Sequence, residues 1–427
     1  MHKFFNTAGA CQPDIHYVVD SLPRLSGIRE LIDGRHYFII HAPRQTGKTT
    51  YLYALMHQLN QEGKYTALAV SIQAAASGQT PQEAMQIAAR IIFEQAQLYL
   101  PATERFTESS PQVDLSSYLG QWARQNPKPL VLFLENVDTW PDASLLALLR
   151  SIRAGFEARP QGFPSSIALT GQRDIRDYKL RHRSTREGLG IGSPFNITSA
   201  TLRFPDFTVA EVEALLSQHL QETRQLFPPE VTQEVYRLTQ GQPWLTNALA
   251  NQIVAEVLKN DYSQPITLAQ VTQAKEELIQ RRDTHLDNLL DKLREPPVKR
   301  MMTAIINGEA PSFDGLNEAI SYTRDLGLIA PKPPVRFANP IYQEIIPRVL
   351  GFGFEEFFPE EVIDPQWYIK QGRLDLEALL LAFQKFYRAN SEAWLEKYDF
   401  REVGRQLLLM AFLQRIINAG GRLEREM

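Results

Sequence analysis

Short apolar runs alternate with helical patterns through the first half of the chain. The runs have the length and continuous apolar character of buried parallel strands, and they lie at 36–41, 65–72, 130–135, 166–170 and 201–204. Between them, apolar residues recur at helical spacing, as over 48–61 and 81–100. The alternation predicts an α/β fold, with a parallel sheet covered by helices on both faces.

After Thr208 the strand patterns stop and helical patterns dominate. Thr208 is the predicted N-cap of a first helix, over 209–220. Further helices are expected at 229–239, 244–258 and 268–282. This succession predicts an all-α lid that follows the sheet.

The last third of the chain predicts two more segments. Residues 285–350 contain a charged helix, a second helix and a short hairpin, which together suggest a winged helix. A linker is expected at 351–365, followed by helices at 374–388, 391–397 and 403–418. The expected domains are therefore an α/β domain, a helical lid, a winged helix and a helical C-terminal segment, at 1–205, 206–284, 285–350 and 351–427.

Composition narrows the class of protein. A chain of 427 residues is too long to form a single hydrophobic core. Its content of 44% hydrophobic and 22% charged residues is ordinary for a soluble protein. The net charge of -4 gives no global reason to bind nucleic acid, and Cys11, the single cysteine, excludes an internal disulfide or a cysteine zinc site. No signal-peptide pattern or membrane-spanning apolar run is visible, so a cytoplasmic protein without membrane contact is expected.

The most specific motif lies between the first predicted strand and the helix after it. Residues 42–50 read Ala-Pro-Arg-Gln-Thr-Gly-Lys-Thr-Thr, close to the P-loop pattern G-x-x-x-x-G-K-[ST], with Ala42 in the first glycine position. A triphosphate carries about four negative charges and needs converging backbone N–H donors and a flexible cation. Lys48 can reach the β and γ oxygens, and the Thr49 hydroxyl can bind Mg²⁺. The predicted ATP-binding residues of this loop are Arg44, Gln45, Thr46, Gly47, Lys48, Thr49 and Thr50.

A second candidate site follows the strand at 130–135. Where P-loop ATPases with an added strand carry Asp and then Glu, this chain carries Glu135 and Asn136. Glu135 keeps the charge that holds Mg²⁺, so it is a predicted metal residue together with Thr49. Asn136 is predicted in the catalytic position, but an amide cannot accept a proton, and a positioned base contributes about 10²- to 10⁴-fold in rate. Slow hydrolysis is expected unless Asp138 or Glu135 acts as the base.

Three further residues are candidates. Thr170 and Arg173 lie at the end of the fourth strand, where a side chain can reach the γ-phosphate. Arg173 either stabilises charge in the transition state or forms a salt bridge to a neighbouring aspartate. Pro243 either covers an adenine or simply starts a helix. The segment 173–186 holds six Lys or Arg against two Asp, which suits either a phosphate or acidic partner or a solvated loop.

Taken together, these motifs resemble a prokaryotic family of signal-transduction (STAND-type) ATPases related to the AAA class. In that family a P-loop domain, a helical lid and a winged helix precede a PD-(D/E)XK nuclease-like domain. The resemblance also implies that Gly241-Gln242-Pro243 lies against the nucleotide base, with the strip around His16 and Tyr17 beside it. It rests on residues 5–9, 16–17, 42–50, 155–171, 241–244, 281–287 and 339–342.

The chain departs from this family in two places. Asp-Glu is replaced by Glu135-Asn136, which argues against efficient hydrolysis and leaves binding intact. Residues 412–426 resemble the entry helix of the nuclease domain, whose Asp and (Glu/Gln)-x-Lys would lie beyond Met427, as in a truncated gene or a fragment. Glu424 and Glu426 alone are not expected to support metal-dependent cleavage.

Three functions follow as hypotheses. The leading one is a regulatory switch that binds ATP·Mg between the P-loop domain and the lid and relays that state to the winged helix. A protein partner or self-association is compatible with this hypothesis. The second is a winged-helix DNA-binding protein, although Arg324, Lys332 and Arg336 are too few to argue a groove reader. The third is an active ATPase whose turnover Lys48→Ala would abolish.

Overall fold

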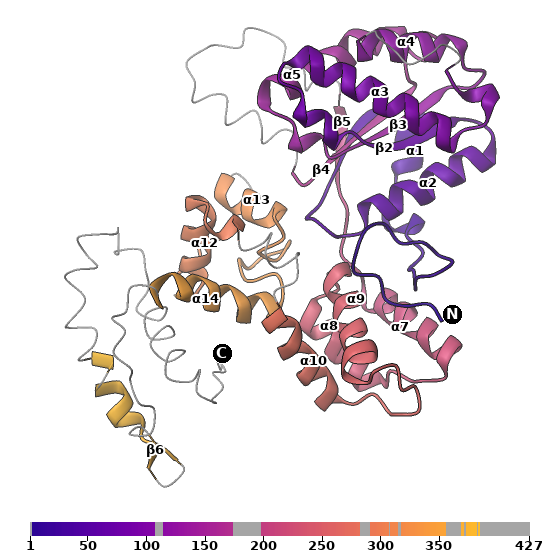
Figure 1. Cartoon of the computed structure of the whole chain (residues 1–427). Coiled ribbons are helices and arrows are strands. Elements are labelled where there is room, and N and C mark those ends of the chain that lie inside the picture. Colours follow the sequence, from indigo (N-terminus) through magenta and orange to yellow (C-terminus); the bar gives the residue numbers. More distant parts are fainter. Residues whose placement is uncertain are drawn as a thin grey trace. The chain divides into compact units, whose positions relative to one another are not determined.

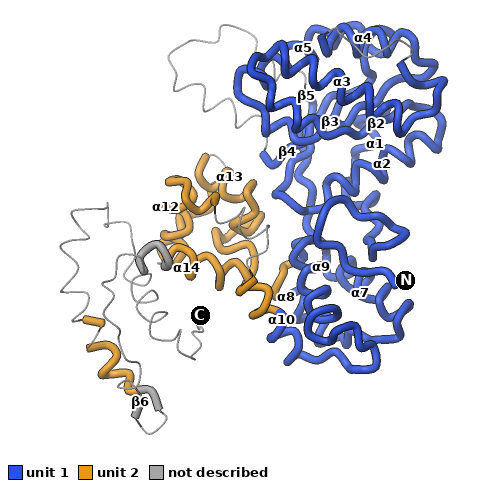
Figure 2. The backbone as a smooth tube through the Cα atoms, viewed as in Figure 1, with its two compact units in different colours: residues 1–236, 241–274 blue, residues 237–240, 275–427 orange. Residues whose placement is uncertain are grey.

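The structure is a computed structural model of the chain, and it divides into two compact units (Figure 2). Unit 1 comprises residues 1–236 and 241–274, and unit 2 comprises 237–240 and 275–427. The described residues are 2–106, 114–173, 198–281, 291–306, 308–314, 317–355, 369–370, 373–381 and 383–384.

Unit 1 is built on a five-stranded sheet in the order β2-β3-β4-β1-β5, with every neighbouring pair parallel. The strands are β1 (Tyr37–His41), β2 (Thr66–Ser71), β3 (Leu130–Glu135), β4 (Ser166–Gly171) and β5 (Thr198–Arg203). The first four are buried almost throughout, as their apolar runs predict. The α/β class and the five strands are confirmed, although the last strand begins three residues earlier than the predicted 201.

Helices cover both faces of this sheet. α1 (Ile28–Asp33) and α2 (Lys48–Glu62) lie on one face, and α3, α4 and α5 pack together on the other (Figure 1). These three helices are Pro81–Tyr99, Leu115–Gln125 and Asp142–Gly155. Because parallel strands all point one way, the loops after β1, β3, β4 and β5 meet at one edge of the sheet.

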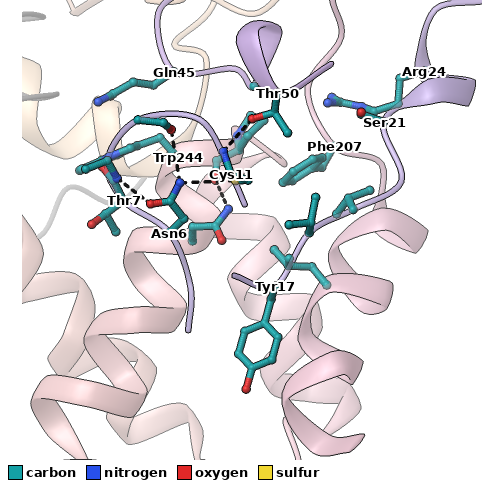
Figure 3. A pocket seen from close by; sticks show the side chains of 18 residues that line it. Asn6, Thr7, Cys11, Tyr17, Ser21, Arg24, Gln45, Thr50, Phe207 and Trp244 are labelled. Carbon is teal, nitrogen blue, oxygen red and sulfur yellow. Dashed lines mark hydrogen bonds between the residues drawn. The ribbon is translucent and has the colours of Figure 1, made fainter. Parts of the chain in front are cut away.

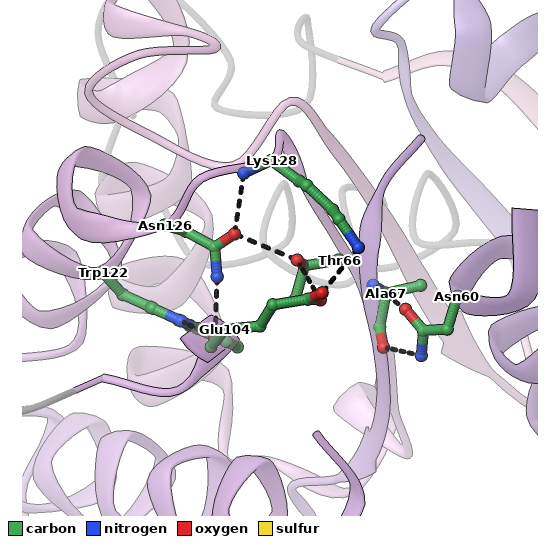
Figure 4. A network of polar contacts seen from close by, with 7 residues as sticks. All are labelled: Asn60, Thr66, Ala67, Glu104, Trp122, Asn126 and Lys128. Atoms are coloured by element: carbon green, nitrogen blue, oxygen red, sulfur yellow. Dashed lines mark hydrogen bonds and ion pairs between the residues drawn. The ribbon is translucent and has the colours of Figure 1, made fainter. Parts of the chain in front are cut away.

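A buried polar network closes the opposite edge (Figure 4). The Glu104 carboxylate accepts hydrogen bonds from the Thr66 hydroxyl at 2.6 Å and from the Lys128 ammonium at 2.5 Å. Asn126 and Trp122 both donate to the Glu104 carbonyl, at 2.7 and 3.0 Å. The network joins the short 3-10 helix Ala102–Glu104 to the starts of β2 and β3, and it stabilises the sheet from the side away from the P-loop.

The helices after β5 begin where the sequence predicts. Thr208 caps α7 (Val209–Thr223) in a capping box with Glu211. The following helices are α8 (Pro229–Thr239), α9 (Pro243–Asn251) and α10 (Leu268–Arg281). The single helix predicted at 244–258 is wrong in one respect, because α9 passes at Gln252–Val257 into a π-helical turn.

The N-terminal strip, residues 5–19, is held against α7 by a buried aromatic cluster. The rings of Phe5 and Tyr17 lie 4.8 Å apart, and both contact the imidazole of His219 on α7. Nδ1 of His219 lies 3.2 Å from the Tyr17 hydroxyl, and Nε2 lies 2.9 Å from Gln225 Oε1. Because the Gln225 amide nitrogen donates to two carbonyls, its oxygen faces His219 and accepts from Nε2–H. Burial lowers the pKa of His219, so the neutral ring is favoured.

Unit 2 contains α12 (Pro296–Ile306), α13 (Glu318–Asp325) and α14 (Pro340–Glu355). The predicted hairpin is present as a single antiparallel bridge between Ile329 and Phe337, and a two-stranded ribbon, β6 (Ile369–Lys370) with β7 (Arg373–Leu374), follows. The helices expected at 391–397 and 403–418, and the nuclease-like segment 412–426, lie outside the described residues. The winged helix and the four domain boundaries stay predictions. Within the described part of the chain, no helix is long and apolar enough to cross a membrane.

Candidate nucleotide-binding site

The P-loop connects the end of β1 to the start of α2. Gly47 at φ 85° and Gln45 at φ 59° both adopt the left-handed conformation, which turns the backbone sharply before α2 begins at Lys48. Thr46 is 1% exposed, and its hydroxyl donates to the Pro43 carbonyl at 3.0 Å, which closes the loop from inside. The start of α2 therefore presents its free backbone N–H groups at the sheet edge, as a phosphate site requires.

Lys48 is held beneath this loop. Its ammonium donates to the carbonyls of Ala42 and Pro43, both at 2.8 Å. Burial lowers the pKa of Lys48 to about 8, against the opposing fields of Asp138 and Glu135. A bound polyphosphate would add negative charge beside the ammonium and raise that pKa again.

Thr49 and Glu135 form the candidate magnesium site. The Thr49 hydroxyl donates to Glu135 Oε2 at 2.6 Å, so the lone pairs of its oxygen stay available to a cation. Glu135 is 3% exposed, and its other oxygen, Oε1, is buried and has no hydrogen-bond partner in the part of the chain that the structure describes. An unpartnered buried carboxylate oxygen is costly, and Mg²⁺ with its coordinated waters would satisfy it. The donor set therefore fits Mg²⁺.

Asn136 follows β3 in the left-handed conformation, with φ 60° and ψ 35°. Its amide nitrogen donates to the Ser71 hydroxyl at 3.0 Å, which joins the ends of β3 and β2. The Asp138 carboxylate accepts from the backbone N–H of Gln172, just after β4, at 2.8 Å. The carboxylates near Lys48 thus come from the end of β3 and the turn after it, and the amide lies between them in sequence.

A cavity opens from the P-loop toward α9 and the N-terminal strip, and Figure 3 shows its lining. It holds about 630 Å³ of empty space, including the part open to solvent, and its residues include Gln45, Gly47 and Thr50 at the P-loop end. The backbone N–H of Cys11 donates to the Thr50 hydroxyl at 3.0 Å, and the Trp244 indole donates to the Thr7 carbonyl at 2.8 Å. The strip is therefore tied to both the loop and α9, and it forms one wall of the cavity.

The Gly-x-Pro segment at the start of α9 has little steric freedom. Gly241 has φ 73°, and a Cβ there would lie 1.9 Å from the Phe207 carbonyl oxygen. Gln242 caps α9 and reaches the Gln45 carbonyl at 3.4 Å, and Pro243 follows as the first helical residue in the cavity wall. Only glycine fits the turn, and the turn sets Pro243 against the cavity.

One charged residue of the cavity has no sequence motif. Arg24 has a side chain only 4% exposed, with its guanidinium 4.4 Å from the Phe204 ring and 4.8 Å from the Phe207 ring. It pairs with Glu211 of α7 at 3.1 Å and lies 4.0 Å from where a Cβ on Gly47 would be. Arg24 therefore brings a cation between the P-loop and α7, and sequence reasoning missed it because its partners are distant along the chain.

The remaining candidates are placed as follows. Arg44 is exposed on the loop, and Thr170 is buried at the end of β4. Arg173 is half-buried two residues after β4, whereas the rest of the basic segment 173–186 lies outside the described residues. Of the two strip residues that the resemblance implies, Tyr17 lines the cavity and His16 does not.

The parallel sheet, with the P-loop between β1 and α2, defines the class of the fold as that of a P-loop ATPase of the AAA-like type. Among solved structures the chain is similar to a Walker-type ATPase of Pyrococcus abyssi, with 12% identity, a TM-score of 0.56, and coverage of 80% of this chain and 99% of that chain. A RuvB variant of Thermotoga maritima (14% identity, 77% and 95% coverage) and Cdc6p of Pyrobaculum aerophilum (12%, 80% and 89%) match with TM-scores of 0.40. No family model and no curated protein matches the sequence. The likeness at this identity establishes the fold and nothing finer.

Proposed function

We propose that the chain is an ATP·Mg-dependent regulatory switch that binds nucleotide well and hydrolyses it slowly. The observation that carries the proposal is Asn136, an amide directly after the buried Glu135 at the end of β3. Binding needs the P-loop, Lys48, Thr49 and Glu135, and all four are arranged at one edge of the sheet. Rapid hydrolysis also needs a group that accepts a proton from water, and an amide accepts none.

The two nearby carboxylates are poorly suited to replace that base. Glu135 Oε2 is engaged by Thr49 at 2.6 Å, and its charge serves the metal. Asp138 accepts a backbone N–H from Gln172 at 2.8 Å, which fixes its orientation. Mg²⁺, when bound, would neutralise phosphate charge and favour the bound state. These residues then hold the nucleotide, and the retained γ-phosphate favours one lid arrangement.

The signal would pass through contacts that already link the loop to the lid. Gln242 reaches the Gln45 carbonyl, and Arg24 lies beside Gly47 while it pairs with Glu211 on α7. We include in the proposal the cytoplasmic location, the kinship with STAND-type switches and a winged helix at 285–350 that receives the signal. An active ATPase is the second candidate, favoured by the proximity of Asp138 to Lys48.

The test compares Asn136→Glu with Asn136→Gln. The two substituents have nearly the same shape and share the cost of a left-handed φ, about 1 kcal/mol, but only Glu can accept a proton. We expect nanomolar to micromolar ATP·Mg binding by calorimetry in all three proteins, slow wild-type hydrolysis, and a gain of roughly tenfold or more in Asn136→Glu alone. Wild-type turnover above roughly a few per minute that Asp138→Asn abolishes would establish the ATPase instead. Absence of ATP·Mg binding, or binding unaffected by Lys48→Ala, would overturn both.

A further inference from the structure

A residue that lines the cavity beside the P-loop carries a buried hydrogen-bond acceptor without a partner among the described residues. Asn247 lies on α9, lines the cavity and is 6% exposed. Its amide nitrogen donates to the Pro243 carbonyl at 2.8 Å, one helical turn earlier, which sets the orientation of the amide. Its oxygen, Oδ1, is buried and has no hydrogen-bond partner among the described residues.

Other polar groups of the same wall are already used. The Asn6 amide nitrogen donates to the Gly9 carbonyl at 3.3 Å, and its oxygen accepts from the N–H of Ala8 at 3.0 Å. The Trp244 indole N–H is taken by Thr7. Asn247 Oδ1 differs from these groups, and a buried acceptor left unpaired is costly unless a ligand supplies the donor.

The residues that line the cavity indicate which part of a nucleotide would lie near Asn247. Gln45, Gly47 and Thr50 of the P-loop line the cavity, and so do Pro243 and Asn247 of α9. A nucleotide with its phosphates on the loop therefore carries its base toward α9. Apolar residues Val19, Phe207 and Leu215 line the same cavity, as a flat base requires.

We propose that Asn247 is the base-specifying residue of this site, with its Oδ1 accepting a hydrogen bond from the 6-amino group of adenine. The inference rests on the proposed nucleotide-binding function. Adenine presents a donor at position 6, whereas guanine and hypoxanthine present a carbonyl acceptor there. An acceptor facing an acceptor leaves both unpaired, so Asn247 selects ATP over GTP and ITP.

The test pairs a change in the ligand with a change in the protein. The probes are ATP and purine riboside 5′-triphosphate, which lacks only the 6-amino group, each titrated calorimetrically with Mg²⁺. The wild-type chain should bind ATP about tenfold more tightly than the purine analogue, as one recovered hydrogen bond predicts. In Asn247→Leu, which is close in size and has no acceptor, the two triphosphates should bind within about twofold of each other.

Asn251→Leu is the matched control, because Asn251 lies one turn further along α9 and outside the cavity lining. It should keep the wild-type preference. The wild-type comparison needs no variant, so it stands even where Asn247→Leu folds poorly. Equal wild-type affinities for the two probes, or a preference that persists in Asn247→Leu, would overturn the role of Asn247 while leaving the switch proposal standing. Absence of binding by either triphosphate would overturn the proposed function itself.

Discussion

Replacing Glu135 by Gln tests the magnesium site directly. The change removes one negative charge but keeps an oxygen that can accept from the Thr49 hydroxyl, now 2.6 Å away. Because Glu135 is 3% exposed, solvent screens its charge weakly, and nearly all of its effect falls on groups within the site. The loss should therefore appear in Mg²⁺-dependent binding and leave the P-loop contacts unchanged.

The expected size follows from the position of Glu135. A carboxylate that holds a metal through its hydration shell typically contributes 10- to 100-fold in affinity, or about 1.4–2.7 kcal/mol. ATP binding without Mg²⁺ should stay the same or tighten, because Glu135→Gln also removes a negative charge near the triphosphate. The ratio of affinities with and without Mg²⁺ should therefore fall by roughly one to two orders of magnitude.

The assay is calorimetry with ATP, in excess Mg²⁺ and in excess chelator, at fixed ionic strength. Burial raises the pKa of Glu135, against the opposing influences of Thr49 and Lys48, so acidification should weaken the Mg²⁺-dependent part at a higher pH than an exposed glutamate would allow. Glu94→Gln, on the exposed face of α3, is the matched control. An unchanged ratio in Glu135→Gln would refute the assignment of Glu135 to the metal.

Two predictions concern stability. Glu104→Ala should lower the free energy of unfolding by about 2–3 kcal/mol in urea titrations, because Thr66 and Lys128 lose a buried partner, and a cost below about 1 kcal/mol would show that the network is dispensable. His219 binds a proton more readily in the unfolded chain, since burial lowers its folded pKa, so stability should fall as pH drops below about 6.5. Thermal unfolding between pH 7.5 and 5 should show this slope in wild type and a smaller one in His219→Gln, whereas equal slopes would exclude His219 as its source.

The sheet could be predicted because its strands carry their own signal. β1 and β3 are continuous apolar runs that end at polar turns, and both are buried throughout, as that pattern requires. The sequence signals for the helix starts are also local, since Thr208 and Glu211 form a capping box three residues apart. The π-helical turn at Gln252–Val257 carries no local signal, and the predicted helix ran through it.

Residues of the candidate site could be predicted from the sequence only where they belong to a local motif. Lys48 and Thr49 belong to one contiguous motif, and Glu135 is the last residue of a strand whose apolar run is clear in the sequence. Arg24 belongs to the site only because Phe204, Phe207 and Glu211 fold over it from about 180 positions away. Nothing local marks such a residue, because its burial and its charge partner both come from distant parts of the chain.

The structure also changes how Asn136 is understood. The sequence predicts only that Asn136 stands where related ATPases carry a catalytic Glu. Its φ of 60° shows that the position also requires a left-handed backbone, which Asn tolerates better than Glu. Its amide further donates to Ser71, a bond that a carboxylate could not make in the same way. Two physical reasons, the backbone conformation and the contact with Ser71, therefore favour Asn136 independently of any effect on catalysis. A single substitution to Glu would mix a backbone cost, a lost amide donor and a gained base. Gln shares the backbone cost and keeps the amide, so the comparison of Glu with Gln isolates the exchange of an amide for a carboxylate.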